Sequence, residues 1–251
     1  MNARLKSNAA SILVLLALWE ICGRAADSVL IPPLSRVAAA WIRLAASGRL
    51  WDSLLISLAT LAAGFCLAAA AGVVVGLLMG RFREVEHLLD LYINALMSAP
   101  ATAFVPVLIL WLGLGVASRI AVVFFFAFFV VVVNTLTGVK QVDRTFLEMA
   151  RSFGARETEI FFKVMLPAAA PAIFAGIRLG MGRAVKGMVT GEMLLTLTGM
   201  GGMIMQYGSA FATDALFAVI LTVLVVALIT TKAVQLVDRR LTGWKAEIAV
   251  E

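Results

Sequence analysis

Six stretches of this sequence are apolar over about 20 residues, the length that an α-helix needs to cross the ~30 Å hydrocarbon core of a bilayer. Only 14 % of the 251 residues are charged and the mean hydropathy is +1.01, whereas soluble domains carry about 25 % charged residues. This composition excludes a chain of two or three soluble domains. It predicts an all-α, polytopic membrane protein with about six transmembrane helices in one domain, 1–251, whose core lies at about 54–240. The apolar runs are 9–26, 54–79, 91–112, 120–139, 168–195 and 216–237.

The first apolar run has two interpretations. Arg4 and Lys6 precede it, as basic residues precede the apolar region of a secretory signal peptide. The run is interrupted by Trp19, Glu20 and Arg24, and it ends without a clean A-x-A cleavage site. We therefore expect a retained span or signal anchor rather than a cleaved signal peptide.

Basic residues indicate the orientation of the chain. With both termini in the cytoplasm and six crossings, most of the 21 Lys and Arg residues fall on the cytoplasmic side, as the positive-inside rule requires. The net charge of +6 then reflects topology rather than nucleic-acid binding, because no aromatic-basic binding motif accompanies it. We expect a multi-pass protein of the bacterial cell (inner) membrane, with the segment between the fourth and fifth runs in the cytoplasm.

Residue types that perform catalysis or bind metals are isolated in this sequence. Cys22, Cys66 and His87 stand at no ligand spacing to one another. An intramembrane enzyme would need a catalytic cluster such as H-E-x-x-H or G-x-S-x-G, and neither occurs. We expect no catalytic residues and no metal site.

The second run carries a small residue at every fourth position. This spacing places the small side chains on one helical face, which lets another helix approach closely. We expect that helix to belong to the same subunit; contact with a second subunit is the alternative. The positions are Gly64, Ala68, Gly72, Gly76 and Gly80.

A shorter amphipathic helix is expected between the first and second runs. The proline pair Pro32 and Pro33 precedes Val37, Trp41 and Leu44 at helical spacing. Such a helix suits the outer membrane interface.

Two runs contain residues that could line a substrate path. In the third run Pro100 and Pro106 each remove a helical hydrogen bond, so we expect a kinked helix, either beside a path or merely accommodated. In the fifth run, charged side chains at membrane depth must face protein or water rather than lipid. At ~1.5 Å per residue, Arg183 lies ~24 Å along that helix from Pro167. The charged residues either form internal ion pairs or line the path: Arg178, Arg183, Lys186 and Glu192.

The segment at about 145–167 is polar and interrupted by glycine, although it lies between two apolar runs. Gly154 predicts a turn between a first helix and a second short helix at 157–164. In the second helix Ile160, Phe161 and Val164 share a face. An apolar knob that projects into the cytosol suits docking into a groove on another protein. A helix lying flat on the membrane surface is the alternative.

The residue spacing in this segment resembles the EAA loop of ABC importer permeases. That pattern is E-A-A, three residues, G, nine residues and I-x-L-P; Met149 and Val164 depart mildly from it. Further strings, such as "VPVLILWLGLG", "TGMGGMI" and "LVDRRLTGW", resemble the nitrate/sulfonate/taurine branch over about 54–244. Lys186 departs from that branch, in which an apolar residue is expected. The matching EAA positions are Glu148, Ala150, Gly154, Val164, Leu166 and Pro167.

The resemblance implies a type I ABC importer permease, which is a transport subunit and not an enzyme. Its loop would insert a coupling helix into a cleft of a separate cytoplasmic ATP-binding-cassette ATPase. Since the sequence has no G-x-x-x-x-G-K-[ST] phosphate loop, ATP and Mg are expected in that partner, and no cofactor in this chain. The other implied partners are an extracytoplasmic solute-binding protein, a second permease copy (homodimer rather than heterodimer) and membrane lipid, but no nucleic acid. The implied coupling residues are Glu148, Ala150, Gly154, Ala155, Ile160, Phe161, Phe162, Leu166 and Pro167.

The substrate is the least constrained expectation. Arg178, Arg183 and Lys186 favour a small organic anion such as a sulfonate, nitrate or carboxylate. The resemblance also allows a neutral or heterocyclic vitamin or precursor. A channel or transporter that works without ATP is the alternative of another class, although the cytoplasmic loop would be superfluous there.

Overall fold

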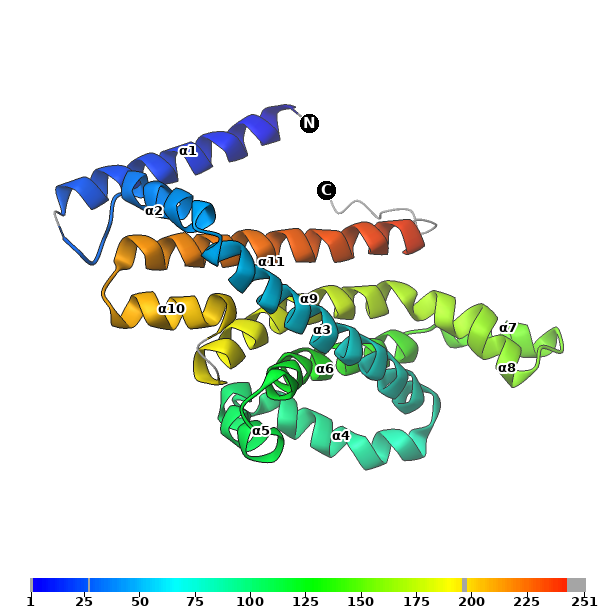
Figure 1. Cartoon of the computed structure of the whole chain (residues 1–251). Helices are drawn as coiled ribbons and strands as arrows, with labels where there is room; N and C mark the ends of the chain where they lie inside the picture. The colour runs from blue at the N-terminus through cyan, green and yellow to red at the C-terminus, as the bar shows by residue number, and fades with distance from the viewer. Residues whose placement is uncertain (1, 27, 196–197, 243–251) are drawn as a thin grey trace.

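The computed structural model describes residues 2–26, 28–195 and 198–242, with side chains described from residue 10 to residue 240 within these ranges. Every regular element in them is a helix, which confirms the all-α class. Figure 1 shows α1 and α2 at one edge, α4 and α5 at the opposite edge, and α7 and α8 beyond one end of the long helices. The elements are α1 (Asn2–Ala25), α2 (Leu34–Ala46), α3 (Arg49–Arg81), α4 (Arg83–Ser98), the 3₁₀-helix η1 (Ala101–Phe104), α5 (Val105–Leu112), α6 (Val116–Lys140), α7 (Arg144–Ser152), α8 (Glu157–Ile160), the π-helical turn η2 (Phe161–Met165), α9 (Leu166–Leu195), α10 (Gly199–Ser209) and α11 (Thr213–Thr242).

Four helical runs among the described residues are long and apolar enough to cross a membrane: α3, α6, the run Glu157–Leu195 and most of α11. Counting the bent pair of α4 with η1 and α5 as one span gives five. The predicted second, fourth, fifth and sixth spans are therefore confirmed. The first apolar run forms α1, but it begins among residues whose side chains the structure does not describe, so its role as a span stays a prediction.

The centre of the molecule is α6, which packs against α3 on one side and α9 on the other. The small residues of α3 face α6, as the four-residue spacing predicted for a helix of the same subunit. A methyl group added at Gly76 would lie 2.5 Å from the Cβ of Thr135, and one added at Gly72 would lie 2.9 Å from the Cβ of Val131. Because real Cβ contacts are longer than this, the two backbones can be this close only with glycine at these positions.

The third apolar run is not one kinked helix, and that prediction is wrong. The chain leaves α4 at Ser98 and continues in η1 and α5 at 100° to α4. Pro100 lies in this break and precedes η1. Pro106 lies in the first turn of α5, where the missing N–H has no helical partner to lose, so it causes no kink.

A second layer is formed by α2, α10 and α11. The helix predicted after the proline pair is present as α2, but its apolar face does not enter the membrane interface. Val37, Ala40 and Leu44 are buried in a cluster with Met200 of α10 and Val219 of α11. The amphipathic pattern correctly predicted a helix. Val37 and Leu44 pack against protein rather than the membrane interface, whereas Trp41 is 39 % exposed, because an amphipathic pattern does not show whether a face meets protein or membrane.

Candidate functional site

The predicted helix-turn-helix between the fourth and fifth runs is present as a compact hairpin. We refer to residues 144–165, which form α7, the following turn, α8 and η2, as the α7–α8 hairpin. The first helix begins at Asp143, whose carboxylate accepts a hydrogen bond from the backbone N–H of Thr145 at 2.9 Å. This backbone hydrogen bond lowers the pKa of Asp143, so the cap is ionised at neutral pH.

The turn is a helix C-cap of the Schellman type, and it explains the spacing of the EAA pattern. Gly154 has φ +78 and donates its N–H to the carbonyl of Arg151 at 2.9 Å. Ala155 donates to the carbonyl of Ala150 at 3.1 Å. In a Schellman motif the left-handed residue stands four positions after the residue whose carbonyl closes the outer bond. Ala150 and Gly154 have this offset, and a left-handed conformation favours glycine.

The start of the second helix is capped by the side chain of Glu159. The Glu159 carboxylate accepts from the backbone N–H of Arg156 at 3.1 Å and forms an ion pair with Lys163 at 2.9 Å. The ion pair, followed by the backbone bond, lowers the pKa of Glu159. The helix then continues through η2 into α9, and its register changes just before Leu166 and Pro167, where the proline has no N–H to donate.

The exposed apolar surface of the hairpin differs from the predicted one. Ile160 is only 2 % exposed, so in this conformation its side chain is not part of the exposed surface of the hairpin. Phe153 and Phe162 are 84 % and 64 % exposed. Phe146 and Met149 extend the row along α7 at positions three and four residues apart, where side chains share a helical face. The spacing of Phe146, Met149 and Phe153 along one helical face is the signal in the sequence that identifies Phe153.

The remaining predicted coupling residues have mixed surroundings. Phe161 is half-buried, and its ring lies 5.0 Å from that of Phe162. Leu166 and Pro167 are half-buried at the start of α9. Glu148 is exposed, and its carboxylate has no hydrogen bond or ion pair to another described residue.

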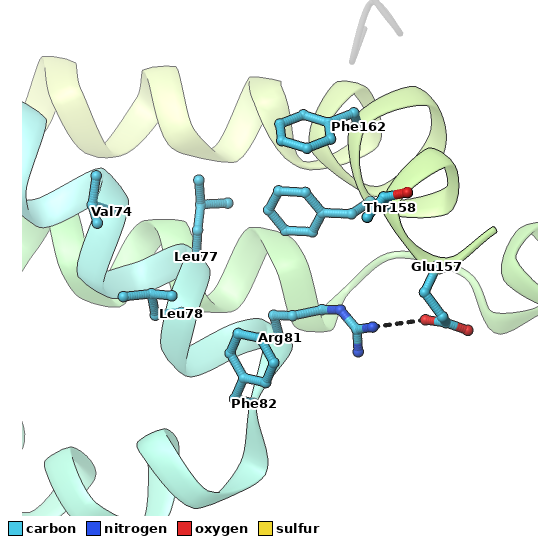
Figure 2. Close-up of a pocket in the computed structure, with 9 residues that line it drawn as sticks. Val74, Leu77, Leu78, Arg81, Phe82, Glu157, Thr158 and Phe162 are labelled. Atoms are coloured by element: carbon cyan, nitrogen blue, oxygen red, sulfur yellow. Dashed lines mark hydrogen bonds and ion pairs between the residues drawn. The ribbon is translucent and has the colours of Figure 1, made fainter.

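Glu157 connects the hairpin to a membrane-spanning helix. One of its carboxylate oxygens lies 2.7 Å from Arg81 at the end of α3, and the other lies 3.0 Å from Arg151 of α7. Figure 2 shows the Arg81–Glu157 pair beside a cavity of about 390 Å³ between α3 and the hairpin. The sequence did not predict this bridge, because its three residues belong to three different elements.

We expect Glu157→Gln to weaken the link between α3 and the hairpin without unfolding either. Exposed ion pairs contribute at most about 1 kcal/mol, so the loss of coupling is expected to be about two- to fivefold. With the ATPase partner that the EAA resemblance implies, the measurement is the number of substrate molecules taken up per ATP hydrolysed in proteoliposomes. The matched control is Glu159→Gln, since Glu159 bonds only within the hairpin. Equal ratios for both variants would contradict the proposed role of the bridge.

The residues predicted to line a substrate path divide into two groups. Pro100, Arg183 and Lys186 line one cavity of about 290 Å³ beside the break after α4, which we call the cation pocket. Arg178 lies elsewhere on α9 and is 3.8 Å from Asp238 of α11, and Pro106 is exposed on α5.

Glu192 is also outside the cation pocket, in a buried network. It is fully buried, and one carboxylate oxygen accepts from the hydroxyl of Ser57 at 2.8 Å and from the backbone N–H of Gly201 at 2.9 Å. Ser57 in turn accepts from the N–H of Met200 at 2.9 Å. Glu192 therefore joins α3 and α9 to the start of α10, which is the packing role that was the alternative to lining a path.

We expect Glu192→Leu to destabilise the protein, because it leaves the Ser57 hydroxyl and the Gly201 N–H without a buried partner. Each unsatisfied buried donor costs about 1–3 kcal/mol. The measurement is the midpoint of thermal aggregation in detergent. Glu192→Gln is the control, since an amide oxygen can still accept both bonds. A midpoint that is the same for the leucine and glutamine variants would show that the network is unimportant for stability.

The known proteins to which this chain is similar are membrane components of transport systems. Residues 72–243 match the family described as "Binding-protein-dependent transport system inner membrane component". The chain is 34 % identical to the putative aliphatic sulfonates transport permease protein SsuC of Bacillus subtilis, over 92 % of this chain and 85 % of that protein. It is 29 % identical to the taurine transport system permease protein TauC of Escherichia coli, over 95 % and 89 % of the two chains. It is 28 % identical to the riboflavin transport system permease protein RibX of Chloroflexus aurantiacus, over 94 % and 89 %.

The fold is similar to a solved transporter. A chain of the inward-facing MetNI methionine ABC transporter superposes with a TM-score of 0.63 at 18 % identity, and the match covers 77 % of this chain and 94 % of that chain. At this identity the likeness concerns the fold. The family match extends over most of the chain and includes the α7–α8 hairpin, the cation pocket residues of α9 and the whole of α10. This chain therefore belongs to the binding-protein-dependent transport system inner membrane components, the permease subunits of ABC importers.

Proposed function

We propose that the α7–α8 hairpin is the surface through which this permease is driven by its ATPase. The observation that carries this proposal is the set of exposed apolar side chains Phe146, Met149, Phe153 and Phe162 on a hairpin that is capped at both helix starts and at its turn. Apolar anchors on a rigid helical element are the usual content of a helix-in-groove interface. The capping fixes the anchors before binding, which lowers the entropic cost of association.

The proposed orientation places the hairpin in the cytoplasm. The start of α1 and the end of α11 are directed toward the side of the molecule on which α7 and α8 lie (Figure 1). Both termini are therefore proposed to be cytoplasmic, in agreement with the positive-inside bias.

The proposed assembly is a homodimer. Arg183 and Lys186 lie in the middle of α9 and are exposed on the single chain. Side chains with a charge at this depth must face protein or water, and a second copy would cover this surface and enclose a water-filled path. A second, different permease chain would meet the same requirement.

The proposed substrate is a small organic anion of the sulfonate type. The relatives named for sulfonates and taurine support this class, as does the positive charge of the cation pocket. The relative named for riboflavin supports the alternative of a heterocyclic vitamin.

The test of the proposed function is purification of the chain from its native membranes in mild detergent, with mass spectrometry of whatever accompanies it. We expect an ATPase with a phosphate loop, and uptake into proteoliposomes that requires ATP. Repeated recovery of the permease alone, with uptake that does not require ATP, would favour the channel or ATP-independent transporter and contradict the proposal.

A further inference from the structure

The cation pocket contains two positive charges that nothing in the described chain neutralises. It lies at the break after α4, and residues of α4, α6 and α9 line it together with Pro100. Arg183 and Lys186 supply its charges, and none of its lining residues is acidic. The wall opposite is aromatic, with Phe125, Phe126 and Phe129 of α6.

Neither cation has a partner among the described residues. Arg178, on the same helix, forms an ion pair with Asp238, and Arg119 donates to Thr198 at 3.0 Å. Arg183 and Lys186 form no hydrogen bond or ion pair with another described residue. They stand three positions apart on one helix, where Cβ atoms are about 5–6 Å apart and like charges repel. Two adjacent unpaired cations at membrane depth are costly, so the pocket is complementary to negative charge that comes from outside this chain.

The cation pocket shares two lining residues with a second cavity. Lys186 and Phe126 line a second cavity of about 420 Å³, which continues along α9 to Thr190 and reaches Val223 of α11. Irregular backbone within a membrane is tolerated where it lines a cavity, and broken helices are frequent at the binding sites of transporters. The break at Pro100 is of this kind.

We propose that the cation pocket is a binding site, within the permease itself, for a small organic ion that carries two negative charges, such as a sulfonate with a carboxylate. The inference rests on the proposed import of an organic anion and makes it more specific. Arg183 binds one anionic group through its planar fork and Lys186 binds the other as a point charge, while the aromatic wall contacts the carbon chain between them. A zwitterion such as taurine would place its ammonium group beside one of these cations and bind more weakly.

The electrostatic part of the proposal can be tested without knowing the substrate. Ser98 lines the pocket and is exposed, so Ser98→Cys introduces a thiol there, in a background with Cys22→Ser and Cys66→Ser. The permease–ATPase complex in nanodiscs is reacted with anionic sulfonatoethyl or cationic trimethylammonioethyl methanethiosulfonate, and each rate is divided by the rate with a free thiol. We expect the anionic reagent to be favoured by at least about tenfold, because two cations lie near the thiol.

Removal of either charge is expected to lower this preference by about threefold or more, in Arg183→Gln and in Lys186→Met. The matched control is Arg178→Gln, which removes a charge from the same helix but outside the pocket, and should leave the preference unchanged. Equal rates for the two reagents, or a preference for the cationic one because an acidic group of a second copy fills the pocket, would overturn the proposal.

The ligand class is tested by protection of the same thiol. We expect sulfoacetate, with two negative charges, to slow the anionic reagent at a concentration about tenfold lower than ethanesulfonate, and taurine to protect least. Equal protection by all three, or none by any, would overturn the assignment to a dianion. Failure of the proposed function would be seen separately, as a permease that does not retain an ATPase during purification.

Discussion

Phe153→Ala combined with Phe162→Ala should abolish recovery of the ATPase with this permease. The two rings are 84 % and 64 % exposed on a capped hairpin, and burial of one aromatic side chain contributes about 1.5–3 kcal/mol. Loss of both is therefore expected to weaken the complex by at least about 100-fold. The measurement is the amount of ATPase that co-purifies with a fixed amount of permease in mild detergent.

A substitution of another exposed phenylalanine is the control, because it removes apolar surface area without changing the proposed docking surface. Phe211 is 67 % exposed, and it lies in the connection between α10 and α11, away from the hairpin (Figure 1). Phe211→Ala should leave ATPase recovery unchanged. Undiminished recovery with the double variant would show that the hairpin is not the docking surface.

The second large effect is expected at the contact between α3 and α6. The added methyl of Gly76→Ala would lie 2.5 Å from the Cβ of Thr135 and 2.7 Å from the carbonyl oxygen of Val132. The carbonyl belongs to backbone that cannot rotate away, so α3 and α6 must separate. Overpacking of this kind costs about 1–3 kcal/mol, and Gly76→Leu should remove most of the protein from the membrane. The measurements are the membrane level of the permease and its midpoint of thermal aggregation.

The control for Gly76→Ala is a substitution that should not lower the midpoint of thermal aggregation. Gly182 lies within α9, and a Cβ added there would meet nothing within 4 Å. Because alanine is favoured over glycine in a helix by about 1 kcal/mol, Gly182→Ala should leave the midpoint unchanged or raise it. A lower midpoint for Gly182→Ala than for Gly76→Ala would refute the packing argument.

The sequence predicted best where a single local rule decides the structure. The apolar runs predicted α3, α6, α9 and α11, and the four-residue spacing of glycines predicted which face of α3 packs. Gly154 predicted the turn of the hairpin, because a left-handed C-cap depends on residues only a few positions apart.

The sequence predicted the surroundings of apolar residues wrongly where the same pattern of residues fits more than one environment. The apolar face of α2 could have met lipid or protein, and it meets α10 and α11. Ile160 and Phe162 are both apolar residues of one short segment, yet one is buried and the other exposed. The helix α10 was not predicted, because its glycines disfavour a helix and its position depends on hydrogen bonds to Glu192 and to Ser57, which is far away in the sequence.

The roles of the charged residues in α9 could not be predicted from the sequence either, because one pattern fits several partners. Charge at membrane depth identified Arg178, Arg183, Lys186 and Glu192 as a group, but only contacts between helices separate them. Asp238 and Ser57, which are far away in the sequence, pair with Arg178 and Glu192, and they leave the other two for the cation pocket.

The close approach of α3 to α6 also bears on how movement passes through the permease. A contact between two side chains can absorb a displacement by a change of rotamer, but glycine has no side chain to rotate, so at Gly72 and Gly76 backbone rests directly on the neighbouring helix. No side-chain rearrangement of these two glycines can therefore absorb a movement between α3 and α6. We therefore expect a displacement of the hairpin, which α6 precedes and α9 follows in the chain, to be passed on to α3 with little loss. The amplitude of the conformational change is then determined by the geometry of the close-packed helices rather than by deformation of the protein interior.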